Sequence, residues 1–216
     1  RQSANVQEPM RLMSHFACSD EVNNPATEKQ LQLFSEIIAG SEGEISQANS
    51  GAVLNWPQSH GDWVRPGLML YGVSPIEGCA GADHGLLPVM TLSSSVIAVR
   101  DVKAGDAVGY GGSWIAAHAT RLAVVAMGYG DGYPRAAGNN ADVLINGKRF
   151  PIVGRVSMDM ITVDIGAESV QVGDKVMLWG ADLPVELLAS CVETIPYELL
   201  CNITSRVQFN YVASEQ

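Results

Sequence analysis

The chain has 216 residues, of which 47% are hydrophobic and 17% are charged, and its net charge is -10 at pH 7. This length allows one large domain or two small ones, with enough apolar material for a core. The acidic balance argues against nucleic acid and anionic membranes as partners, and no apolar run is long enough to span a membrane.

The positions of the histidines and cysteines indicate whether a metal site is present and which compartment the protein occupies. The histidines show no metal-ligand spacing, so we expect no metal site. The four cysteines form no CxxC pair, which indicates free thiols in a reducing compartment and therefore a cytoplasmic protein. No signal peptide is apparent, and the chain opens at Arg1 rather than at methionine, so we expect a processed product or a piece of something larger.

The first half alternates strands and helices. We expect a buried strand over Met10–Phe16 and then a helix with Asn24 as its N-cap, Pro25 at its first position and Gly40 at its end. The next expected elements are a strand at Ile45–Ala48, a short helix at Ala52–Trp56 and a strand at Leu68–Tyr71. This alternation predicts parallel strands with helical crossovers. Three parallel strands alone leave open edges, and a complete (β/α)8 barrel needs roughly 250 residues.

After about residue 86 the pattern changes to short strands with glycine-rich turns, which predicts a small antiparallel barrel or sandwich. Asn146-Gly147 is a strong signal for a two-residue hairpin turn. The expected strands are Val89–Val99, Leu122–Met127, Asp142–Ile145, Lys148–Val153, Met160–Ile165, Lys175–Trp179 and Arg206–Val212, with short helices at Leu183–Val192 and Tyr197–Ile203. The likeliest boundary, Glu77–Leu86, gives an α/β domain over residues 1–85 and an all-β domain over residues 86–216.

The segment Val124–Arg135 is the most informative part of the chain. An apolar strand runs into a turn with glycines at alternate positions, 128, 130 and 132, where the backbone can bend and approach a ligand. The turn would present Tyr129 as a proton donor or acceptor at an exposed strand end. The alternative is a tight turn with an aromatic ring packed over it.

Three further segments could carry chemistry, each with a structural alternative. His15 follows the first strand, whose end would face a ligand in a parallel fold, or it is a satisfied core histidine. Ser50 precedes a helix and suits a phosphate, or it is a plain N-cap. Arg65, with the amides of Gly67 and Leu68, suits an anionic or heteroaromatic group, or it belongs to an ordinary surface loop.

Taken together, the segments HFA, ANS, VRPG–YG, VGYGG, GYGDGYPR, GRVSMDM and YEL, in this order and spacing, closely resemble bacterial alanine racemase, a pyridoxal-phosphate enzyme of fold type III. The resemblance covers essentially the whole chain. It implies the last strands of a (β/α)8, or TIM, barrel in residues 1–85 and a β-rich C-terminal domain in residues 86–216. It also implies an isomerase that interconverts L-alanine and D-alanine by a two-base mechanism with pyridoxal 5'-phosphate. The product would serve peptidoglycan synthesis, or the enzyme would serve alanine catabolism.

The resemblance also implies roles for individual residues. Tyr129 matches one of the two catalytic bases, Arg65 and His15 match the residues at the pyridine ring, and Met158 matches a residue whose backbone N–H meets the substrate carboxylate. The positions that match cofactor-phosphate ligands are Ser50, Gly67, Leu68 and Tyr197. The positions that match the entrance to the site are Tyr110, Asp20, Arg155 and Ile195.

In the family, Tyr129, Met158 and Tyr110 enter the site from the partner subunit, which implies a homodimer with shared sites. The family's Schiff-base lysine has no match here: Lys29, Lys103, Lys148 and Lys175 all lie outside any family lysine motif. We therefore expect activity only together with the missing N-terminal portion of the same enzyme.

Two alternative functions stay open. One is a non-catalytic binding module that uses only the β-rich half, although the presence of Tyr129, Arg65 and Ser50 across both halves favours the racemase. The other is a related fold type III amino-acid decarboxylase. The Arg65 match opposes it, because the family's decarboxylases have an acidic residue at the pyridine nitrogen. An arginine has no proton to spare for that nitrogen, which leaves the ring a weaker electron sink.

Overall fold

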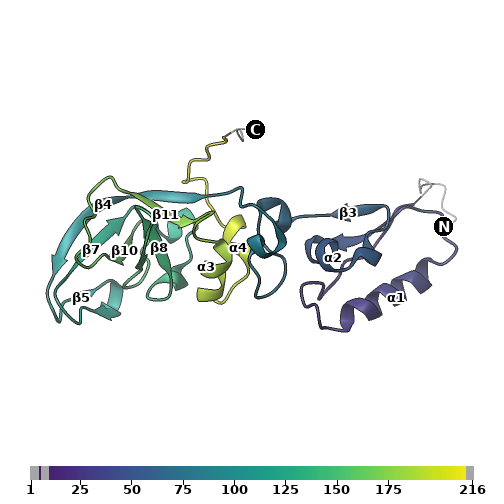
Figure 1. The fold of residues 1–216 in the computed structure, drawn as a ribbon, viewed down its shortest axis with the longest axis horizontal. Coiled ribbons are helices and arrows are strands. Elements are labelled where there is room, and N and C mark those ends of the chain that lie inside the picture. The colour runs from purple at the N-terminus through teal and green to yellow at the C-terminus, as the bar shows by residue number, and fades with distance from the viewer. Residues whose placement is uncertain (1–4, 6–9, 213–216) are drawn as a thin grey trace. The chain divides into compact units, whose positions relative to one another are not determined.

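The structure, a computed structural model, describes residue 5 and residues 10–212. The chain divides into two compact units, Arg1–Val89 and Met90–Gln216, and Figure 1 follows it through both by colour. No helix in the described part is both long and apolar enough to cross a membrane.

The first unit contains a three-stranded parallel sheet in the order β1-β2-β3. The strands are β1 (Leu12–Met13), β2 (Ile45–Asn49) and β3 (Trp63–Arg65). Helix α1 (Ala26–Ile38) connects the first pair, and α2 (Ser50–Asn55) with the 3-10 turn Pro57–Ser59 connects the second. The predicted parallel strands with helical crossovers are therefore confirmed.

The third strand does not lie where the pattern predicted it. Leu68–Tyr71 forms a 3-10 helix, η2, and the strand precedes it. Gly67, with φ -116° and ψ -89°, leads into η2, and Gly72 ends it with φ +75°, a left-handed conformation that favours glycine. A short apolar run does not by itself distinguish a strand from a short helix.

Two other predicted boundaries differ. The first strand was expected over Met10–Phe16 but is only two residues long, and Phe16 instead packs in a small core with Ala48 and Ala52. The N-cap of α1 is Pro25 rather than Asn24. Asn24 nevertheless supplies a capping contact, because its side-chain Oδ1 accepts the Ala26 amide at 2.9 Å.

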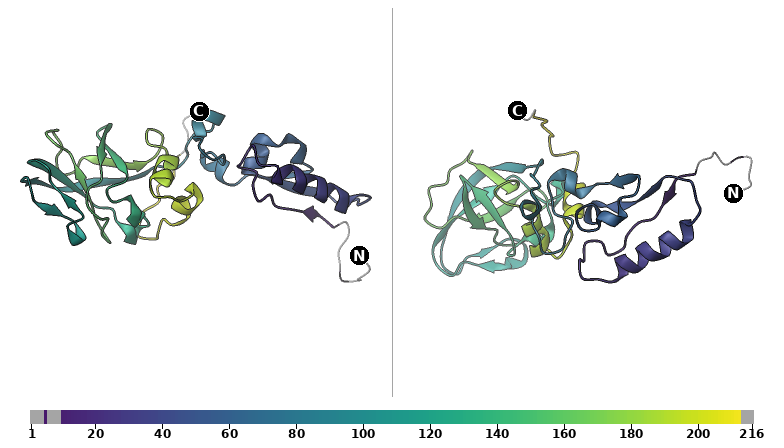
Figure 2. Two further views of the ribbon diagram at one scale, coloured as in Figure 1. Left: turned by 90° about the horizontal axis from the view of Figure 1, so that it is seen from below. Right: turned by 45° about the vertical axis from the view of Figure 1, so that its right-hand side comes forward.

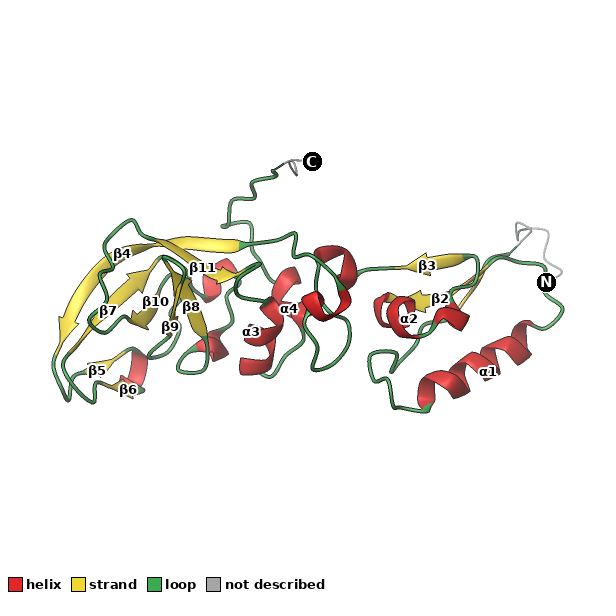
Figure 3. Cartoon of the chain, viewed as in Figure 1, coloured by secondary structure: helices red, strands yellow, loops and turns green. Residues whose placement is uncertain are grey.

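The second unit is built on a six-stranded antiparallel sheet in the order β10-β7-β4-β11-β8-β9. Figure 3 shows that strands and loops make up most of this unit. Its strands are β4 (Leu92–Val102), β7 (Thr120–Val125), β8 (Asp142–Ile145), β9 (Lys148–Pro151), β10 (Ile161–Asp164) and β11 (Lys175–Trp179), with the separate small pair β5 (Ala107–Val108) and β6 (Trp114–Ile115).

The six-stranded sheet nearly closes on itself, so it resembles a barrel rather than a sandwich. A bridge joins Ile152, beyond β9, to Val163 in β10, and the Val153 amide donates to the Thr162 carbonyl at 2.8 Å. The change of partner follows Pro151, which has no amide to donate to β8. Figure 2 shows the strands curving around a common interior, and the bridge brings the ends of the two outer strands together.

The interior of this barrel is filled by small branched side chains. The fully buried ones include Val96, Val125, Val143, Val163 and Val176, each 1% exposed or less. These residues come from five of the six strands, so the barrel has a continuous apolar core that supports the loops at its ends.

The hairpin at Asn146-Gly147 is confirmed. Both residues have positive φ, 52° and 77°, and Ile145 pairs with Lys148, which is the geometry of a type I' turn.

Two short helices follow, α3 (Val185–Cys191) and α4 (Pro196–Cys201). The predicted last strand over Arg206–Val212 is wrong, because the structure shows a turn, a bend and irregular chain there.

Candidate active site

The candidate residues of the first unit lie at the carboxyl ends of its parallel strands. His15 comes two residues after β1, Ser50 directly follows β2, and Arg65 is the last residue of β3. Parallel strands point the same way, so their carboxyl ends lie at one edge of the sheet, where α/β proteins bind ligands.

Arg65 ties all three strand ends together. Its guanidinium donates to Ser46 Oγ at 2.7 Å, to the Ser14 carbonyl at 2.8 Å and to the Gln47 carbonyl at 3.2 Å. A terminal nitrogen also lies 3.3 Å from Nδ1 of His15. Because a guanidinium only donates, Nδ1 accepts, which places the proton of a neutral imidazole on Nε2. The two structural alternatives are wrong, since Arg65 ends a strand and is partly buried while His15 is exposed rather than in the core.

Ser50 gathers backbone amides around its hydroxyl. Its Oγ, in a residue only 2% exposed, accepts from the Gly67 amide at 2.8 Å and from the Met69 amide at 3.4 Å. It is not the N-cap of α2, because Asn49 caps that helix by accepting from Ala52 at 3.1 Å. The hydroxyl of Ser50 therefore keeps its own proton available for an acceptor.

The space beside this hydroxyl is open at Gly67. A Cβ added to Gly67 would lie 3.8 Å from Ser50 Oγ, so a side chain at this position would project into that space. Leu68 is the first residue of η2, where a helix presents amides that its own carbonyls do not accept. The Gly67 and Met69 amides already donate to Ser50 Oγ, so the hydroxyl proton of Ser50 is the donor of this cluster that could serve a phosphate.

In the second unit, Tyr129 and Met158 are brought together. Tyr129 begins the 3-10 turn η5 (Tyr129–Asp131) after β7, and its side chain is 41% exposed. Its amide donates to the Ser157 carbonyl at 3.0 Å, and the Gly130 amide donates to the Met158 carbonyl at 2.9 Å. A Cβ on Gly128 would collide with the same two carbonyls, so glycine is required for this close approach.

A second tyrosine of the same turn has the opposite environment. Tyr133 is 1% exposed and stacks on Trp179 with ring centroids 6.4 Å apart. Burial raises the pKa of Tyr133 well above its ordinary value, and the nearby Cys191 and Asp142 raise it further. Tyr133 therefore stays protonated, and Tyr129 is the phenol of this turn that a substrate could reach.

The predicted entrance residues are exposed and occupy both units. In the second unit Tyr110 is 69% exposed in the turn η4 (Tyr110–Gly112), which packs near Arg155 because a Cβ on Gly111 would lie 3.5 Å from its guanidinium. Ile195 is the N-cap of α4 and Tyr197 lies within that helix, both exposed.

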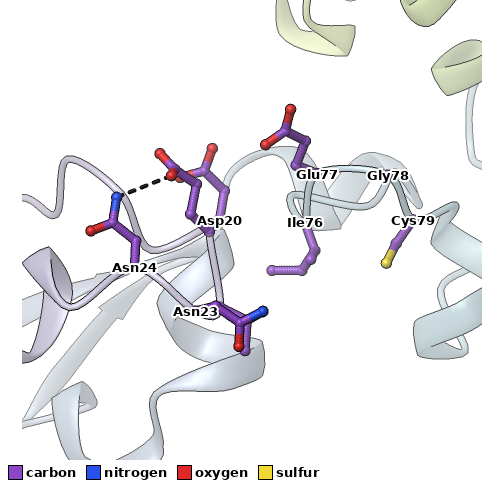
Figure 4. A pocket seen from close by; sticks show the side chains of 9 residues that line it. Asp20, Asn23, Asn24, Ile76, Glu77, Gly78 and Cys79 are labelled. Carbon is purple, nitrogen blue, oxygen red and sulfur yellow. Dashed lines mark hydrogen bonds between the residues drawn. The ribbon is translucent and has the colours of Figure 1, made fainter.

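Asp20, in the first unit, lines a pocket of about 690 Å³ with Asn23, Asn24, Ile76 and Glu77 among its neighbours (Figure 4). Neither Ser50 nor Arg65 lines this pocket. Its chain neighbour Ser19 nevertheless donates to Asn49 Oδ1 at 2.6 Å, one residue before Ser50.

Sequence reasoning missed the residues that support these side chains. Ser46 and Gln47 hold Arg65, and Asp131 holds the turn of Tyr129 by accepting the Gly128 amide at 2.9 Å. A signal was present in each case: polar residues interrupt an otherwise buried strand at 46 and 47, and an aspartate stands inside a glycine-rich turn at 131.

Comparisons with known proteins agree with this architecture. A family model described as "Alanine racemase, N-terminal domain" matches residues 1–75, and one described as "Alanine racemase, C-terminal domain" matches residues 89–211. Among curated relatives, the biosynthetic alanine racemase of Escherichia coli (strain K12) is 56% identical over 213 residues, covering 98% of this chain and 59% of that protein. The alanine racemase of Yersinia pestis is 54% identical over 209 residues, covering 96% of this chain and 58% of that protein.

Solved structures give the same result. The biosynthetic alanine racemase from Pseudomonas aeruginosa superposes with a TM-score of 0.91 at 46% identity, covering 94% of this chain and 57% of that one. The alanine racemase from Bartonella henselae, solved with covalently bound pyridoxal phosphate, gives 0.86 at 34% identity, covering 94% and 56%.

The fold is thus the terminal part of a (β/α)8 barrel followed by a β-rich domain, as predicted. The chain belongs to the alanine racemase family, a family of fold type III pyridoxal-phosphate enzymes. It spans somewhat less than three fifths of the length of the curated relatives it matches.

Proposed function

We propose that this chain forms the C-terminal portion of an alanine racemase that interconverts L-alanine and D-alanine. Residues 1–85 would supply the last part of the barrel and residues 86–216 the β-rich domain. The observation that carries the proposal is the arrangement of Arg65, which binds the ends of three parallel strands while touching His15. This arrangement presents a fixed cation and an imidazole at the edge of the sheet where the Ser50 hydroxyl also lies.

These residues fit pyridoxal 5'-phosphate, which when bound withdraws electrons from the α-carbon of an amino acid and so acidifies its proton. Ser50, Gly67 and Leu68 would hold the phosphate together with Tyr197. Arg65 would face the pyridine nitrogen. Because a guanidinium stays protonated, Arg65 would offer this nitrogen a hydrogen bond but no proton.

Tyr129 would move the α-proton on one face of the substrate. A free phenol has a pKa of about 10. A tyrosine that acts as a base at neutral pH therefore needs positive charge nearby. The backbone N–H of Met158 would bind the substrate carboxylate beside it. Tyr110, Asp20, Arg155 and Ile195 would line the entrance.

The rest of the machinery would come from outside this chain. Racemisation needs a second base on the opposite face, and we propose that the N-terminal portion of the same enzyme supplies it as a lysine. We further propose a homodimer in which Tyr129, Met158 and Tyr110 serve the partner's site. The four free cysteines support action in the cytoplasm, and D-alanine would serve peptidoglycan synthesis or catabolism.

The decisive experiment is Tyr129→Phe in the enzyme completed with the rest of its barrel. Removing the hydroxyl should slow racemisation in both directions by about a hundredfold or more, since each direction uses both bases. Tyr133→Phe is the matched control. Its hydroxyl is buried and has no hydrogen-bond partner within the described residues, so the control should keep the parental rate.

Polarimetry from each pure enantiomer measures both rates. Parental turnover of Tyr129→Phe in both directions would remove Tyr129 from the mechanism. A completed parental enzyme that binds pyridoxal phosphate but does not racemise alanine would refute the proposed function as a whole.

A further inference from the structure

We infer that Arg206 is a positioning residue for Tyr129, because it locks the turn that carries the tyrosine to the segment that carries Met158. The inference rests on the proposed function for its catalytic consequence. The two ion pairs of Arg206, with Asp131 and with Asp159, are contacts within this chain and are called the lock below. Arg206 lies in the region after α4 that was expected to be a strand.

One guanidinium joins two carboxylates from different loops. Nε of Arg206 lies 3.2 Å from Asp131 Oδ1, and a terminal nitrogen donates to Asp159 Oδ1 at 2.6 Å. Asp131 is two residues after Tyr129, and Asp159 directly follows Met158. The planar fork of an arginine can hold two acceptors in fixed directions, which a lysine cannot do.

The carboxylate of Asp131 is built into the turn. Asp131 is 9% exposed, and its second oxygen accepts the Gly128 amide at 2.9 Å, which closes the turn around Tyr129. A buried carboxylate needs a charged partner or hydrogen bonds to offset its lost hydration. Arg206 supplies that partner from outside the turn, and the hydrogen bond to Asp159 raises the pKa of Arg206 above its ordinary value, so it stays charged.

The chain beside Arg206 holds the same turn through its backbone. Thr204 Oγ1 donates to the Gly130 carbonyl at 2.9 Å, and the Thr204 amide donates to the Asp131 carbonyl at 3.1 Å. A Cβ on Gly130 would collide with a terminal nitrogen of Arg206. Glycine at this position is therefore what lets the guanidinium lie directly on the turn.

This support bears on Tyr129 because the tyrosine lies in one of the two segments that Arg206 joins and is hydrogen-bonded to the other. Its side chain is 41% exposed, and its own amide is held by Ser157 in the segment that Asp159 anchors. A shift of that segment relative to the turn would move the phenol relative to the substrate-binding amide of Met158. Misplacing a catalytic group by about 1 Å can cost about a hundredfold in rate.

The test compares Arg206→Met and Arg206→Lys in the completed enzyme, with Lys148→Met as the control. Lys148 lies in β9 of the same unit and forms an exposed ion pair with Glu168 at 2.6 Å. The first readout is amide hydrogen exchange of the peptides that contain Gly128, Tyr129 and Gly130, without substrate. The second readout is kcat and KM for alanine.

We expect Arg206→Met to accelerate exchange at these amides and to lower kcat by about tenfold or more, with a small change in KM. Arg206→Lys should recover part of both effects, because the charge remains while the fork is lost. Lys148→Met should change neither readout. If Arg206→Met fails to fold, the exposed Asp159→Asn, which removes the negative charge from one of the two contacts, should shift both readouts in the same direction.

Parental exchange in the Arg206 variants and in Asp159→Asn would overturn the lock. Faster exchange with parental kcat would overturn the positioning role. A parental enzyme without racemase activity would refute the proposed function, and the exchange data would still decide whether Arg206 holds the turn.

Discussion

Arg65 combines a structural and a chemical role in one side chain. Its hydrogen bonds to Ser46, Ser14 and Gln47 connect β3 to β2 and to the end of β1. Its guanidinium also lies 3.3 Å from Nδ1 of His15, which can accept a hydrogen bond from it. Replacing Arg65 should therefore affect both the stability of the first unit and the reaction.

Arg65→Glu should lower the free energy of unfolding by about 1–3 kcal/mol, because a carboxylate cannot donate to the two carbonyls and leaves them unpaired. It should also slow racemisation and increase transamination, since a carboxylic acid can share a proton with the pyridine nitrogen. Denaturant titration and the pyruvate formed per turnover of the completed enzyme measure the two effects.

The variant Arg65→Lys distinguishes the effect on stability from the effect on the reaction. It keeps the charge but loses the fork, so it should lose stability without more transamination. If Arg65→Glu shows parental stability, rate and reaction specificity, Arg65 does not contact the cofactor.

The junction of β2 and α2 places the proposed phosphate site. Asn49 ends the strand and caps the helix, and its Oδ1 accepts from both the Ala52 amide at 3.1 Å and the Ser19 hydroxyl at 2.6 Å. These contacts fix the first turn of α2, and Ser50 is its first residue. The N-cap contacts of Asn49 thus determine where the Ser50 hydroxyl lies.

Asn49→Ala should lower the free energy of unfolding by about 1 kcal/mol, the usual effect of losing an N-cap. It should also weaken binding of pyridoxal phosphate, because Ser50 is no longer held against Gly67. Asn49→Asp keeps an acceptor and should restore both properties. Asn140→Ala, an exposed asparagine far along the chain from this helix, is the control for the substitution itself. Absorbance titration measures the affinity for pyridoxal phosphate. If Asn49→Ala binds the cofactor as tightly as the parent, Asn49 does not position the phosphate site.

The two units differ in how completely each covers its own sheet. The β-rich unit nearly closes into a barrel with a buried interior. The parallel sheet of the first unit has only three strands, and Met13 and Trp63 on its outer strands are 64% and 51% exposed. Parallel sheets are stable when both faces are covered and their edges are paired. We therefore expect the first unit to be stable only with further barrel segments against it.

We expect the chain by itself to show strong amide protection in β11 and weak protection in β2. Adding the N-terminal portion of the enzyme should protect β2 and leave β11 unchanged. Hydrogen exchange followed by mass spectrometry measures both strands in one sample. A monodisperse, cooperatively unfolding chain with both strands protected and no companion polypeptide on a denaturing gel would contradict this expectation.

Local sequence was sufficient to predict those elements whose conformation depends on residues nearby in the chain. The Asn146-Gly147 hairpin, the strand Lys175–Trp179 and the order of parallel strands and helices follow from turn chemistry and periodicity, and the structure confirms them. The order and spacing of motifs also determined the family, because those segments keep their identity along the chain whatever they contact.

Tertiary structure decided everything that depends on a distant partner. It turned Leu68–Tyr71 into a helix and left Arg206–Val212 without a strand partner. It also buried Tyr133 while leaving Tyr129 accessible. Periodicity constrains local backbone conformation, but burial, pKa and hydrogen-bond partners depend on which surfaces meet. That choice is made by packing between segments far apart in sequence, which no local pattern encodes.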